Sequence, residues 1–496
     1  MTEDFDHLWR PAIHFTPQRY WMSDPCGLVC WKGEYHLFYQ HNPFSNEWGP
    51  MHWGHAASDD LFTWKHHPIA LVPDTKNGMI YTGSTVYDAN NTSGLFELSE
   101  GGDGLVALYT GAVPTSDPAY PIQHQCLAYS IDAYHWHMFE SAPVLANNGS
   151  PDFRDPKVVY HASSAQWIMV LAVGTEVRFY CSKNLKVWQY LSSFGAEQGN
   201  HEGVWECPDL IELPVKNHTT ASRWLLLIHV GQGLSTEHAG AQYFVGDFDG
   251  IRFIPEEGTS LKGQWVDLGH DFYAAKSWAN IPVKSNRTIW IAWASHSAYS
   301  HDIPTKTWRG VLTVPREISL RKLDGRHLIA QEPVEELIAL RETLVSAKST
   351  SGNSKTELSY SVEGSRAYEI VAELPADSCV QIKLSFHGTQ SVVLVVDTKA
   401  NQIIIDRSRT GMDRFSNRFQ LRKRVMMPES LSKQSLIPIR VLWDRCILEV
   451  FVQNGVVSCT DLVFSPSPLR KIRITNTKKI EPTRVSVYQL RKTMDY

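Results

Sequence analysis

Between Pro11 and Arg321 the chain consists of short runs of β-branched and aromatic residues separated by turn-forming residues. No long stretch in this region shows the 3.6-residue apolar period of a helix. Short strands at regular spacing predict an all-β sandwich, barrel or propeller. A span of about 300 residues with local strand connections favours the propeller. The clearest expected strands are Tyr35–Gln40, Leu105–Thr110, Trp167–Val173, Trp224–His229 and Thr288–Ala294.

Three segments in this region resemble one another in the pattern S-x-[DN]-L-x-x-W. The copy at Ser130–Trp136 is weaker, because Ala133 replaces the leucine. A segment that returns at intervals is typical of repeated units such as propeller blades. The three segments are Ser58–Trp64, Ser130–Trp136 and Ser182–Trp188.

The pattern changes after residue 330. Glu332–Leu340 is the best helical stretch, and Ser346–Lys355 is polar and rich in Ser and Thr, as linkers are. Alternating apolar and polar runs follow, over a length that suits one β-sandwich. We therefore predict a propeller over residues 1–340, a linker over 341–355 and a β-sandwich over 356–496. The expected sandwich strands are Val380–Phe386, Ser391–Asp397, Gln402–Asp406 and Ile447–Val452.

The composition limits the classes of molecule that this chain is expected to bind. The formal charge is -5 without a basic stripe, which gives a nucleic-acid or anionic-membrane partner no electrostatic support. No apolar run approaches the ~20 residues of a membrane span. A neutral small molecule is therefore the expected substrate. The 17 Trp residues belong either to the core or to a sugar site, where a flat ring covers the apolar face of a furanose or pyranose.

The cysteines and histidines predict no metal or cofactor. The eight Cys residues form no C-x-x-C pair and are expected to be dispersed, mostly buried thiols. His52 and His55 lack a paired acidic or Cys motif, so they are expected to be structural. The acidic start Met1–Asp6 favours a cytoplasmic protein over one with a signal peptide. Sequons would matter in a secreted form; they occur at Asn90, Asn91, Asn148, Asn217 and Asn286.

Three acidic residues have a proline close behind them: Asp24 and Asp155 precede one directly, and Glu206 precedes one by two positions. Proline restricts the backbone before it and fixes the direction of the neighbouring side chain. Any one of these sites taken alone is more simply a turn.

With these acids in their contexts, the chain resembles family 32 of the glycoside hydrolases, the invertases, inulinases and levanases. The resemblance covers nearly the whole chain and implies a five-bladed β-propeller followed by a β-sandwich. Its motifs are Trp21–Gly27, Leu37–Pro43, Trp48–His55, Tyr81–Ser84, Phe153–Pro156, Trp205–Pro208, Asp271–Ala274 and Pro315–Glu317.

The resemblance also implies roles. Asp24 is similar to the family's nucleophile, Glu206 to its acid/base and Asp155 to its transition-state stabiliser, as retention through a fructosyl-enzyme ester requires. A cation at Arg154 is expected to keep Asp155 ionised. The residues expected to bind the substrate are Ser23, Gln40, Trp48, Tyr81, Thr82 and Arg154.

Two positions depart from the family's pattern. Ser23 and Cys26 stand where the family usually carries Asn on both sides of the Asp-Pro pair, which puts the balance of hydrolysis and transfer in doubt. Ser297 stands where many eukaryotic relatives carry an aromatic residue, so their leaving-group preference does not carry over.

The expected function is a retaining β-fructofuranosidase that hydrolyses sucrose and related β-fructosides, with transfructosylation. Three alternatives stay open: a dedicated fructosyltransferase, an enzyme acting on arabinosides or xylosides, and a catalytically idle carbohydrate-binding propeller. The sandwich either binds glycan or supports the propeller. Its exposed edges could pair with a second copy, so a homo-oligomer is also left open.

Overall fold

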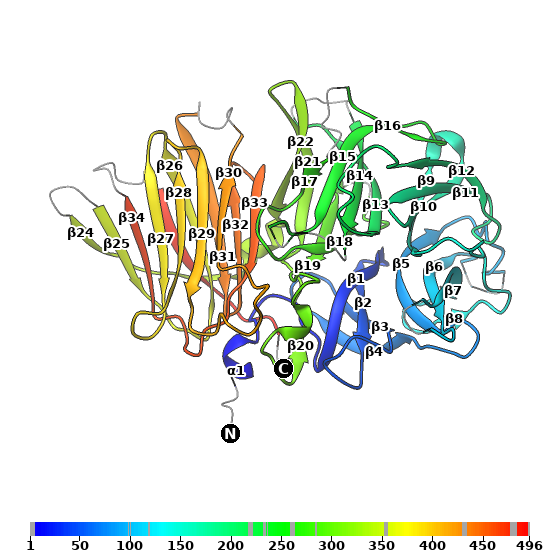
Figure 1. Cartoon of the computed structure of the whole chain (residues 1–496), viewed down its shortest axis with the longest axis horizontal. Helices are drawn as coiled ribbons and strands as arrows, with labels where there is room; N and C mark the ends of the chain where they lie inside the picture. The colour runs from blue at the N-terminus through cyan, green and yellow to red at the C-terminus, as the bar shows by residue number, and fades with distance from the viewer. Residues whose placement is uncertain are drawn as a thin grey trace.

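The protein has two β-rich parts that lie side by side (Figure 1). The computed structural model describes residues 5–97, 99, 101–117, 120–216, 222–231, 235, 237–257, 263–282, 285–351, 356–428, 434–476 and 484–494. The one described α-helix is α1 (Asp6–Trp9), and the other short helical turns are 3₁₀ turns at Ala162–Ser164, Ser300–Asp302 and Glu335–Leu340. None of the helices in the described ranges is long and apolar enough to cross a membrane. The predicted all-β fold is confirmed.

Five sheets, antiparallel except for the β1–β20 pair, form the blades of a propeller. Blade 1 contains β1 (Tyr20–Trp31), β2 (Glu34–Asn42), β3 (His52–Ser58), β4 (Lys65–Leu71) and β20 (Trp308–Arg309). Blade 2 contains β5 (Met79–Asp88), β6 (Gly104–Val113), β7 (Ile122–Ser130) and β8 (His137–Met138). Blade 3 contains β9 (Phe153–His161), β10 (Gln166–Val173), β11 (Glu176–Ser182) and β12 (Gln189–Phe194).

Blades 4 and 5 complete the ring. Blade 4 contains β13 (Trp205–Pro214), β14 (Ser222–Val230), β15 (Ala241–Phe248), β16 (Phe253–Pro255) and β17 (Gln264–Trp265). Blade 5 contains β18 (Tyr273–Ser277), β19 (Ile289–Trp293), β21 (Arg316–Leu323) and β22 (Arg326–Pro333). The five expected strands of the first 300 residues are β2, β6, β10, β14 and β19, the second strand of each blade. These strands are buried on both faces, which explains their strong apolar signal.

The first strand of each blade is the innermost one. β1 contacts β5, β5 contacts β9, β9 contacts β13, β13 contacts β18, and β18 contacts β1 again. Between blades 5 and 1, β20 pairs in parallel with the start of β1, and the Cys30 N–H donates to Ala279 O at 2.9 Å. These contacts close the ring, so residues from five distant segments meet at its centre.

The repeated S-x-[DN]-L-x-x-W segments form one kind of turn, between the third and fourth strands of blades 1, 2 and 3. In each, a side-chain oxygen accepts backbone N–H groups two and three residues ahead, as Asp60 Oδ1 does from Phe62 at 2.9 Å and Thr63 at 2.6 Å. Asp249 makes the same contacts in blade 4, where the sequence lacks the pattern's Trp. The predicted blade repeat is confirmed.

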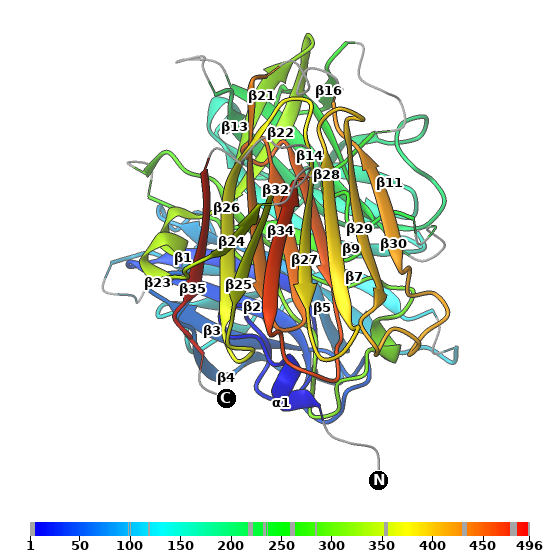
Figure 2. The ribbon, with the colours of Figure 1, turned by 90° about the vertical axis from the view of Figure 1, so that its left-hand side faces the viewer.

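Two sheets form the C-terminal β-sandwich, which faces the viewer in Figure 2. One sheet holds β23 (Arg341–Leu344), β35 (Arg484–Leu490), β26 (Ala367–Pro375), β31 (Leu436–Asp444), β32 (Ile447–Val452) and β33 (Val457–Leu462). The other holds β24 (Lys348–Ser351), β25 (Thr356–Ser361), β34 (Lys471–Asn476), β27 (Cys379–Ser385), β28 (Ser391–Asp397), β29 (Gln402–Arg409) and β30 (Arg422–Met426). The expected sandwich strands are present as β27, β28, β29 and β32.

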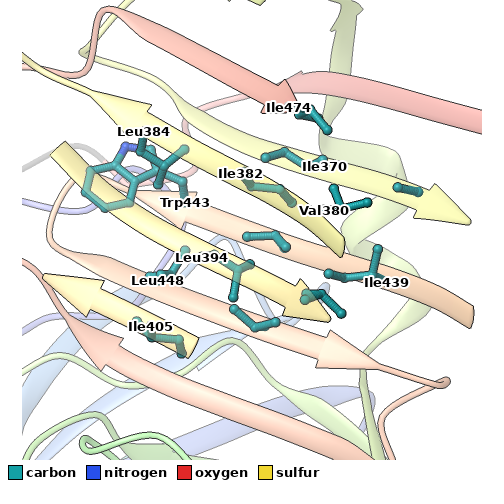
Figure 3. Close-up of a cluster of buried hydrophobic side chains, with 14 of the residues drawn as sticks. Ile370, Val380, Ile382, Leu384, Leu394, Ile405, Ile439, Trp443, Leu448 and Ile474 are labelled. Atoms are coloured by element: carbon teal, nitrogen blue, oxygen red, sulfur yellow. The ribbon is translucent and has the colours of Figure 1, made fainter. Parts of the chain in front are cut away.

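The alternation of apolar and polar residues predicts which sandwich side chains point inward. In β27, Val380, Ile382 and Leu384 are buried and the residues between them are partly exposed. They meet side chains of the opposite sheet, including Ile439 and Trp443 (Figure 3). Each fully buried aliphatic side chain of this kind contributes about 1.5 to 3 kcal/mol relative to an exposed one.

Two expectations around residue 340 are wrong. The helical signal at Glu332–Leu340 is only a 3₁₀ turn from Glu335, because Leu337 and Leu340 are buried at the three-residue spacing that a 3₁₀ turn provides. The expected linker over 341–355 contains strands β23 and β24 in its described part. β23 pairs with β35, almost 150 residues later, so its partner lies outside any local sequence window. The division of the chain near residue 340 stays a prediction.

The propeller covers an edge of the sandwich. β33 is the last strand of its sheet, and the backbone N–H groups of Leu268, His270 and Asp271 donate to carbonyls of Ser458 and Thr460 at 2.8 to 3.1 Å. Fully buried ion pairs lie along the same interface: Arg316 with Asp267 and Glu449, Arg407 with Asp271, and His14 with Asp444. The edge is thus paired within the chain rather than exposed to a second molecule.

Candidate active site

Each of the five innermost strands supplies a residue to the centre of the ring. Pairing with the next strand is interrupted at or beside that residue in every blade, which is the mark of a β-bulge. A bulge turns a side chain out of the ordinary alternation, and bulges are common beside active sites. The residues are Asp24 on β1, Tyr81 and Thr82 on β5, Arg154 and Asp155 on β9, Glu206 on β13 and Tyr273 on β18.

Blades 3, 4 and 5 share a further detail. Asp155, Cys207 and Ala274, at corresponding positions of the three bulges, all have left-handed backbones, with φ of 64°, 49° and 50°. Non-glycine residues seldom adopt this conformation, and it clusters at functional sites. The bulge, rather than a glycine, therefore sets the direction of the chain at each site.

Asp24 lies within contact of two other blades. Thr82 Oγ1 donates to Asp24 Oδ2 at 2.7 Å, and the Cys207 thiol donates to the same oxygen at 3.4 Å. Burial raises the pKa of Asp24 to about 7, and the negative charges of Asp155 and Glu206 add to the rise while the two donors oppose it. The ionised form of Asp24 is thus destabilised by its surroundings, which favours its reaction as a nucleophile.

Asp155 is buried and is hydrogen-bonded to residues of two other blades. Its Oδ2 accepts the Cys207 backbone N–H at 2.8 Å, and its own N–H donates to Thr110 Oγ1 at 2.9 Å. Thr110 in turn donates to Gln125 Oε1 at 2.8 Å, which fixes the direction of the threonine hydroxyl. Asp155 therefore sits on a rigid support from blades 2 and 4.

Arg154 was expected to act on its neighbour Asp155, but its hydrogen bonds to acidic residues go to two other carboxylates. Arg154 donates to Glu206 Oε1 at 2.9 Å and also to Asp152, so its direct partners are these two carboxylates. Burial raises the pKa of Asp155, and the Arg154 charge opposes that rise without cancelling it. Desolvation of this buried carboxylate thus outweighs the effect of a cation whose direct hydrogen bonds go to other carboxylates.

Glu206 is held at both oxygens. Arg154 binds Oε1, and the Tyr273 hydroxyl donates a short hydrogen bond to Oε2. Burial and the Glu206 charge raise the pKa of Tyr273 well above its usual value, so Tyr273 keeps its proton. Tyr273 belongs to the Asp271–Ala274 motif, but sequence reasoning gave it no role. The sequence did offer one signal: besides Asp271, Tyr273 is the only residue of this motif whose side chain can form hydrogen bonds.

β18 lies along β13 and is fixed to it by side chains. Neutral His229 bridges the two, because its Nδ1 donates to Cys207 O at 3.1 Å while its Nε2 accepts the Ala275 N–H at 3.0 Å. Burial lowers the pKa of His229 to about 3, in agreement with that neutral form. Lys276 Nζ donates to Pro208 O at 2.8 Å, and Asp209 accepts the Ser277 N–H at 2.8 Å. Three successive positions of β13, Cys207, Pro208 and Asp209, are thereby held.

The remaining expected binding residues lie in blades 1 and 2. Trp48 is 45% exposed, and its ring meets Tyr81 edge-on with 5.6 Å between centroids. Ser23 and Gln40 are buried, and neither forms a hydrogen bond with the three acids in the described part of the chain. The Gln40 amide nitrogen is a buried donor without a hydrogen-bond acceptor among the described residues. It is therefore available to a ligand hydroxyl.

His52 and His55 have different neighbours in the described part of the chain. His55 stacks on Phe38 and lies 3.0 Å from His36, and His52 Nδ1 contacts Pro50 O. Across the described residues no cluster of three His, Cys, Asp or Glu side chains is arranged to hold a metal. The eight cysteines are free thiols, six of them buried, as predicted.

Comparison with known proteins agrees with this geometry. Two family models match the chain: the glycosyl hydrolases family 32 N-terminal domain over residues 14–333 and the family's C-terminal domain over residues 336–489. The chain belongs to glycosyl hydrolase family 32. It is therefore a glycoside hydrolase with the propeller and sandwich of that family.

Individual family 32 relatives match over most of their length. A levanase from Bacillus subtilis is 40% identical over 464 residues, covering 92% of this chain and 67% of the levanase. An extracellular exo-inulinase from Aspergillus niger is 31% identical, covering 99% of this chain and 96% of the exo-inulinase.

Solved structures of family 32 enzymes superpose closely. An exo-inulinase from Aspergillus awamori has a TM-score of 0.88 at 29% identity, covering 99% of this chain and 100% of that one. A fructofuranosidase from Schwanniomyces occidentalis, complexed with fructose, has a TM-score of 0.86 at 29% identity, covering 99% and 100%.

Proposed function

We propose that this family 32 protein is a retaining β-fructosidase that releases fructose from sucrose and fructans and also transfers fructose to other sugars. One observation carries the proposal. Asp24, Asp155 and Glu206 come from three blades and are joined through the single dipeptide Glu206–Cys207. A nucleophile, a stabiliser and an acid that share one support keep a fixed relative geometry, as retention requires.

In the first step, an oxygen of ionised Asp24 attacks the anomeric carbon of the fructosyl unit. The bond from that carbon to the leaving oxygen breaks, and Glu206 gives its proton to the leaving oxygen. In the second step, Glu206 takes a proton from water, the water oxygen bonds to the anomeric carbon, and Asp24 leaves as a carboxylate. The proton on Glu206 is thus restored at the end of the cycle.

The surroundings favour the charged transition state. Among the described residues, one backbone N–H donates to buried Asp155, at Oδ2, which leaves capacity for sugar hydroxyls. Such hydrogen bonds strengthen as positive charge develops on the fructosyl ring. Arg154 and Tyr273 orient Glu206 without reacting themselves.

The substrate class follows from the relatives and the local surface. The levanase and the exo-inulinase support fructan chains as substrates, and the fructofuranosidase in complex with fructose supports a fructosyl group in the site. The edge-on Trp48 and Tyr81 pair offers an exposed aromatic face for a neutral sugar. None of these contacts selects sucrose over a fructan terminus.

The test is chromatography of products from sucrose, kestose, inulin and levan. The proposal expects free fructose from sucrose and from at least one fructan. A protein that releases no fructose from any of the four is not a β-fructosidase. Mainly oligosaccharide products from sucrose would instead identify a dedicated fructosyltransferase.

Transfer is proposed because of Ser23, next to Asp24. Asn would offer two polar contacts to the sugar or to the attacking water, whereas Ser offers one hydroxyl and leaves space. A hydrogen bond contributes a net ~0.5 to 1.5 kcal/mol, enough to move a partition ratio roughly two- to tenfold. We expect Ser23→Asn to shift products toward free fructose at high sucrose. An unchanged ratio of transferred to released fructose would remove Ser23 as the cause.

A further inference from the structure

Strand β18 begins at Tyr273, and the chain is hydrogen-bonded to the sandwich two residues earlier, at Asp271. Asp271, two residues before Tyr273, is fully buried and accepts at both oxygens. Its Oδ2 accepts from Arg407 at 2.7 Å and from the Leu462 N–H at 2.8 Å, and its Oδ1 accepts the Tyr299 hydroxyl at 2.5 Å. Arg407 and Leu462 belong to β29 and β33 of the sandwich. The sandwich therefore sets the position of Asp271.

Arg407 is itself held firmly. It is fully buried, donates to Leu462 O and to Gln420 O at 2.7 Å each, and its guanidinium lies 3.7 Å from the centre of the Phe419 ring. A planar guanidinium with this many partners has little freedom to move. Any displacement of the sandwich edge at Arg407 therefore moves Asp271 with it.

The path from Asp271 to Glu206 is short and tightly packed. Phe272, which lies between Asp271 and Tyr273 in sequence, is fully buried, and the Tyr273 hydroxyl donates to Glu206 Oε2. The ring of Tyr273 is packed against the backbone of Gly240, where an added Cβ would lie 3.0 Å from Tyr273 Cε2. Close packing of this kind transmits small shifts rather than absorbing them.

We propose that Arg407, acting through Asp271, is a positioning residue that holds Tyr273 against the acid/base Glu206. The inference rests on the proposed function, because it assigns Glu206 the delivery of a proton to the leaving group. It also gives the sandwich a part in catalysis beyond supporting the propeller.

If Arg407 has this role, its loss should lower activity more on substrates whose leaving group needs a proton than on substrates whose leaving group does not. Glu206 must protonate a sugar leaving group, whereas 4-nitrophenolate leaves without help from an acid. If Arg407 only stabilised the fold, its loss would lower activity on both kinds of substrate alike. The experiment compares kcat/KM for sucrose with kcat/KM for 4-nitrophenyl β-fructofuranoside, because kcat/KM covers the steps up to the fructosyl-enzyme.

The variants are Arg407→Gln and Asp271→Asn, with Arg341→Gln as the matched control. Arg341 also forms a two-point ion pair with a buried carboxylate of the sandwich, Glu369, at 2.6 and 3.0 Å, but it does not contact Asp271. Thermal unfolding of each variant reports the structural cost separately. Arg341→Gln is expected to lower Tm and to leave the ratio of the two kcat/KM values unchanged.

For Arg407→Gln and Asp271→Asn we expect kcat/KM for sucrose to fall roughly ten- to hundredfold, the scale of a misplaced catalytic group. The value for the aryl fructoside should fall less than about threefold. Equal losses on both substrates, or no loss on sucrose, would overturn the proposal. If neither variant folds, Tyr299→Phe removes one donor from the same carboxylate, and an unchanged ratio there overturns it too. Wild-type protein inactive on both substrates would instead refute the proposed function.

Discussion

Cys207 joins two carboxylates that the chain brings from different blades: its thiol lies 3.4 Å from Asp24 Oδ2, and its backbone N–H donates to Asp155 Oδ2 at 2.8 Å. Cys207 has a left-handed backbone and directly follows Glu206. The residue that turns the chain after the acid/base thus also fixes the nucleophile and the stabiliser. A small displacement of this one residue would disturb all three acids.

The first prediction removes each reacting group at constant size. Asp24→Asn and Glu206→Gln should each lower turnover of sucrose or levan by about a thousandfold or more while the protein stays folded. Steady-state kinetics and thermal unfolding of the purified variants check this. Activity above about a tenth of wild type, a loss under ~1.4 kcal/mol, would mean that the residue does not have the assigned role.

The second prediction concerns the wall behind Glu206. A Cβ at Gly231 would lie 2.3 Å from Glu206 Oε2 and 2.9 Å from the Tyr273 hydroxyl. Gly231→Ala should therefore displace the acid/base and lower kcat about a hundredfold, with a smaller change in KM. Kinetics with sucrose provide the measurement.

The control for Gly231→Ala lies in the same blade. A Cβ at Gly246 would lie 2.1 Å from Ile254 O, between β15 and β16, so Gly246→Ala imposes a similar clash away from the acids. It should lower Tm and leave kcat of the folded protein near wild type. If both variants lost kcat equally, the clash at Glu206 would not be the reason.

The third prediction is the acid side of the pH profile. Burial raises the pKa of Asp24 to about 7 in the free protein. Because the proposed reaction needs Asp24 ionised, kcat/KM should fall as pH drops below about 7, approaching tenfold per pH unit. A Thr82→Val variant loses a donor to the carboxylate and should move this limb to higher pH. If the acidic side of the kcat/KM profile had the same apparent pKa in Thr82→Val as in wild type, Asp24 would not be the group that causes it.

The fourth prediction concerns stability at alkaline pH. Burial lowers the pKa of His14, but its contacts with Asp444 and Glu449 outweigh burial and raise the pKa to about 9. A raised folded pKa gives stability that is complete below about 6.5 and lost as pH rises through about 9. Tm should therefore fall between pH 7 and 9.5, with a loss of about 1 to 3 kcal/mol. His14→Gln should flatten this slope, and an equally steep slope in the variant would contradict the account.

Much of the fold could be predicted from local patterns. The second strand of each blade is strongly apolar and was found directly, as at Trp167–Val173, and the repeated turn at Ser58–Trp64 marked the blades. The family motifs also pointed to Asp24, Asp155 and Glu206, which the structure brings close together, and their catalytic roles stay predictions. The expected helix near Leu337 was wrong, since two leucines three residues apart fit a 3₁₀ turn as well as an α-helix.

The support of the acids could not be predicted in the same way. The Arg407 to Asp271 bond joins residues 136 positions apart, and β23 pairs with β35 across nearly the whole sandwich. Such contacts depend on how the two domains meet, which no local period encodes. Likewise, the bulges that aim Asp155 and Glu206 depend on strand register, and register is a property of the assembled sheet.

The most direct test of the central claim is to trap the fructosyl-enzyme. Glu206→Gln protein, incubated with 4-nitrophenyl β-fructofuranoside, should release 4-nitrophenol in a burst but should lack the base that speeds hydrolysis of the ester. Mass spectrometry of the digested protein should then find one added hexosyl unit on the peptide that carries Asp24. A hexosyl unit attached elsewhere, or no adduct together with release of fructose in the inverted configuration, would contradict the account.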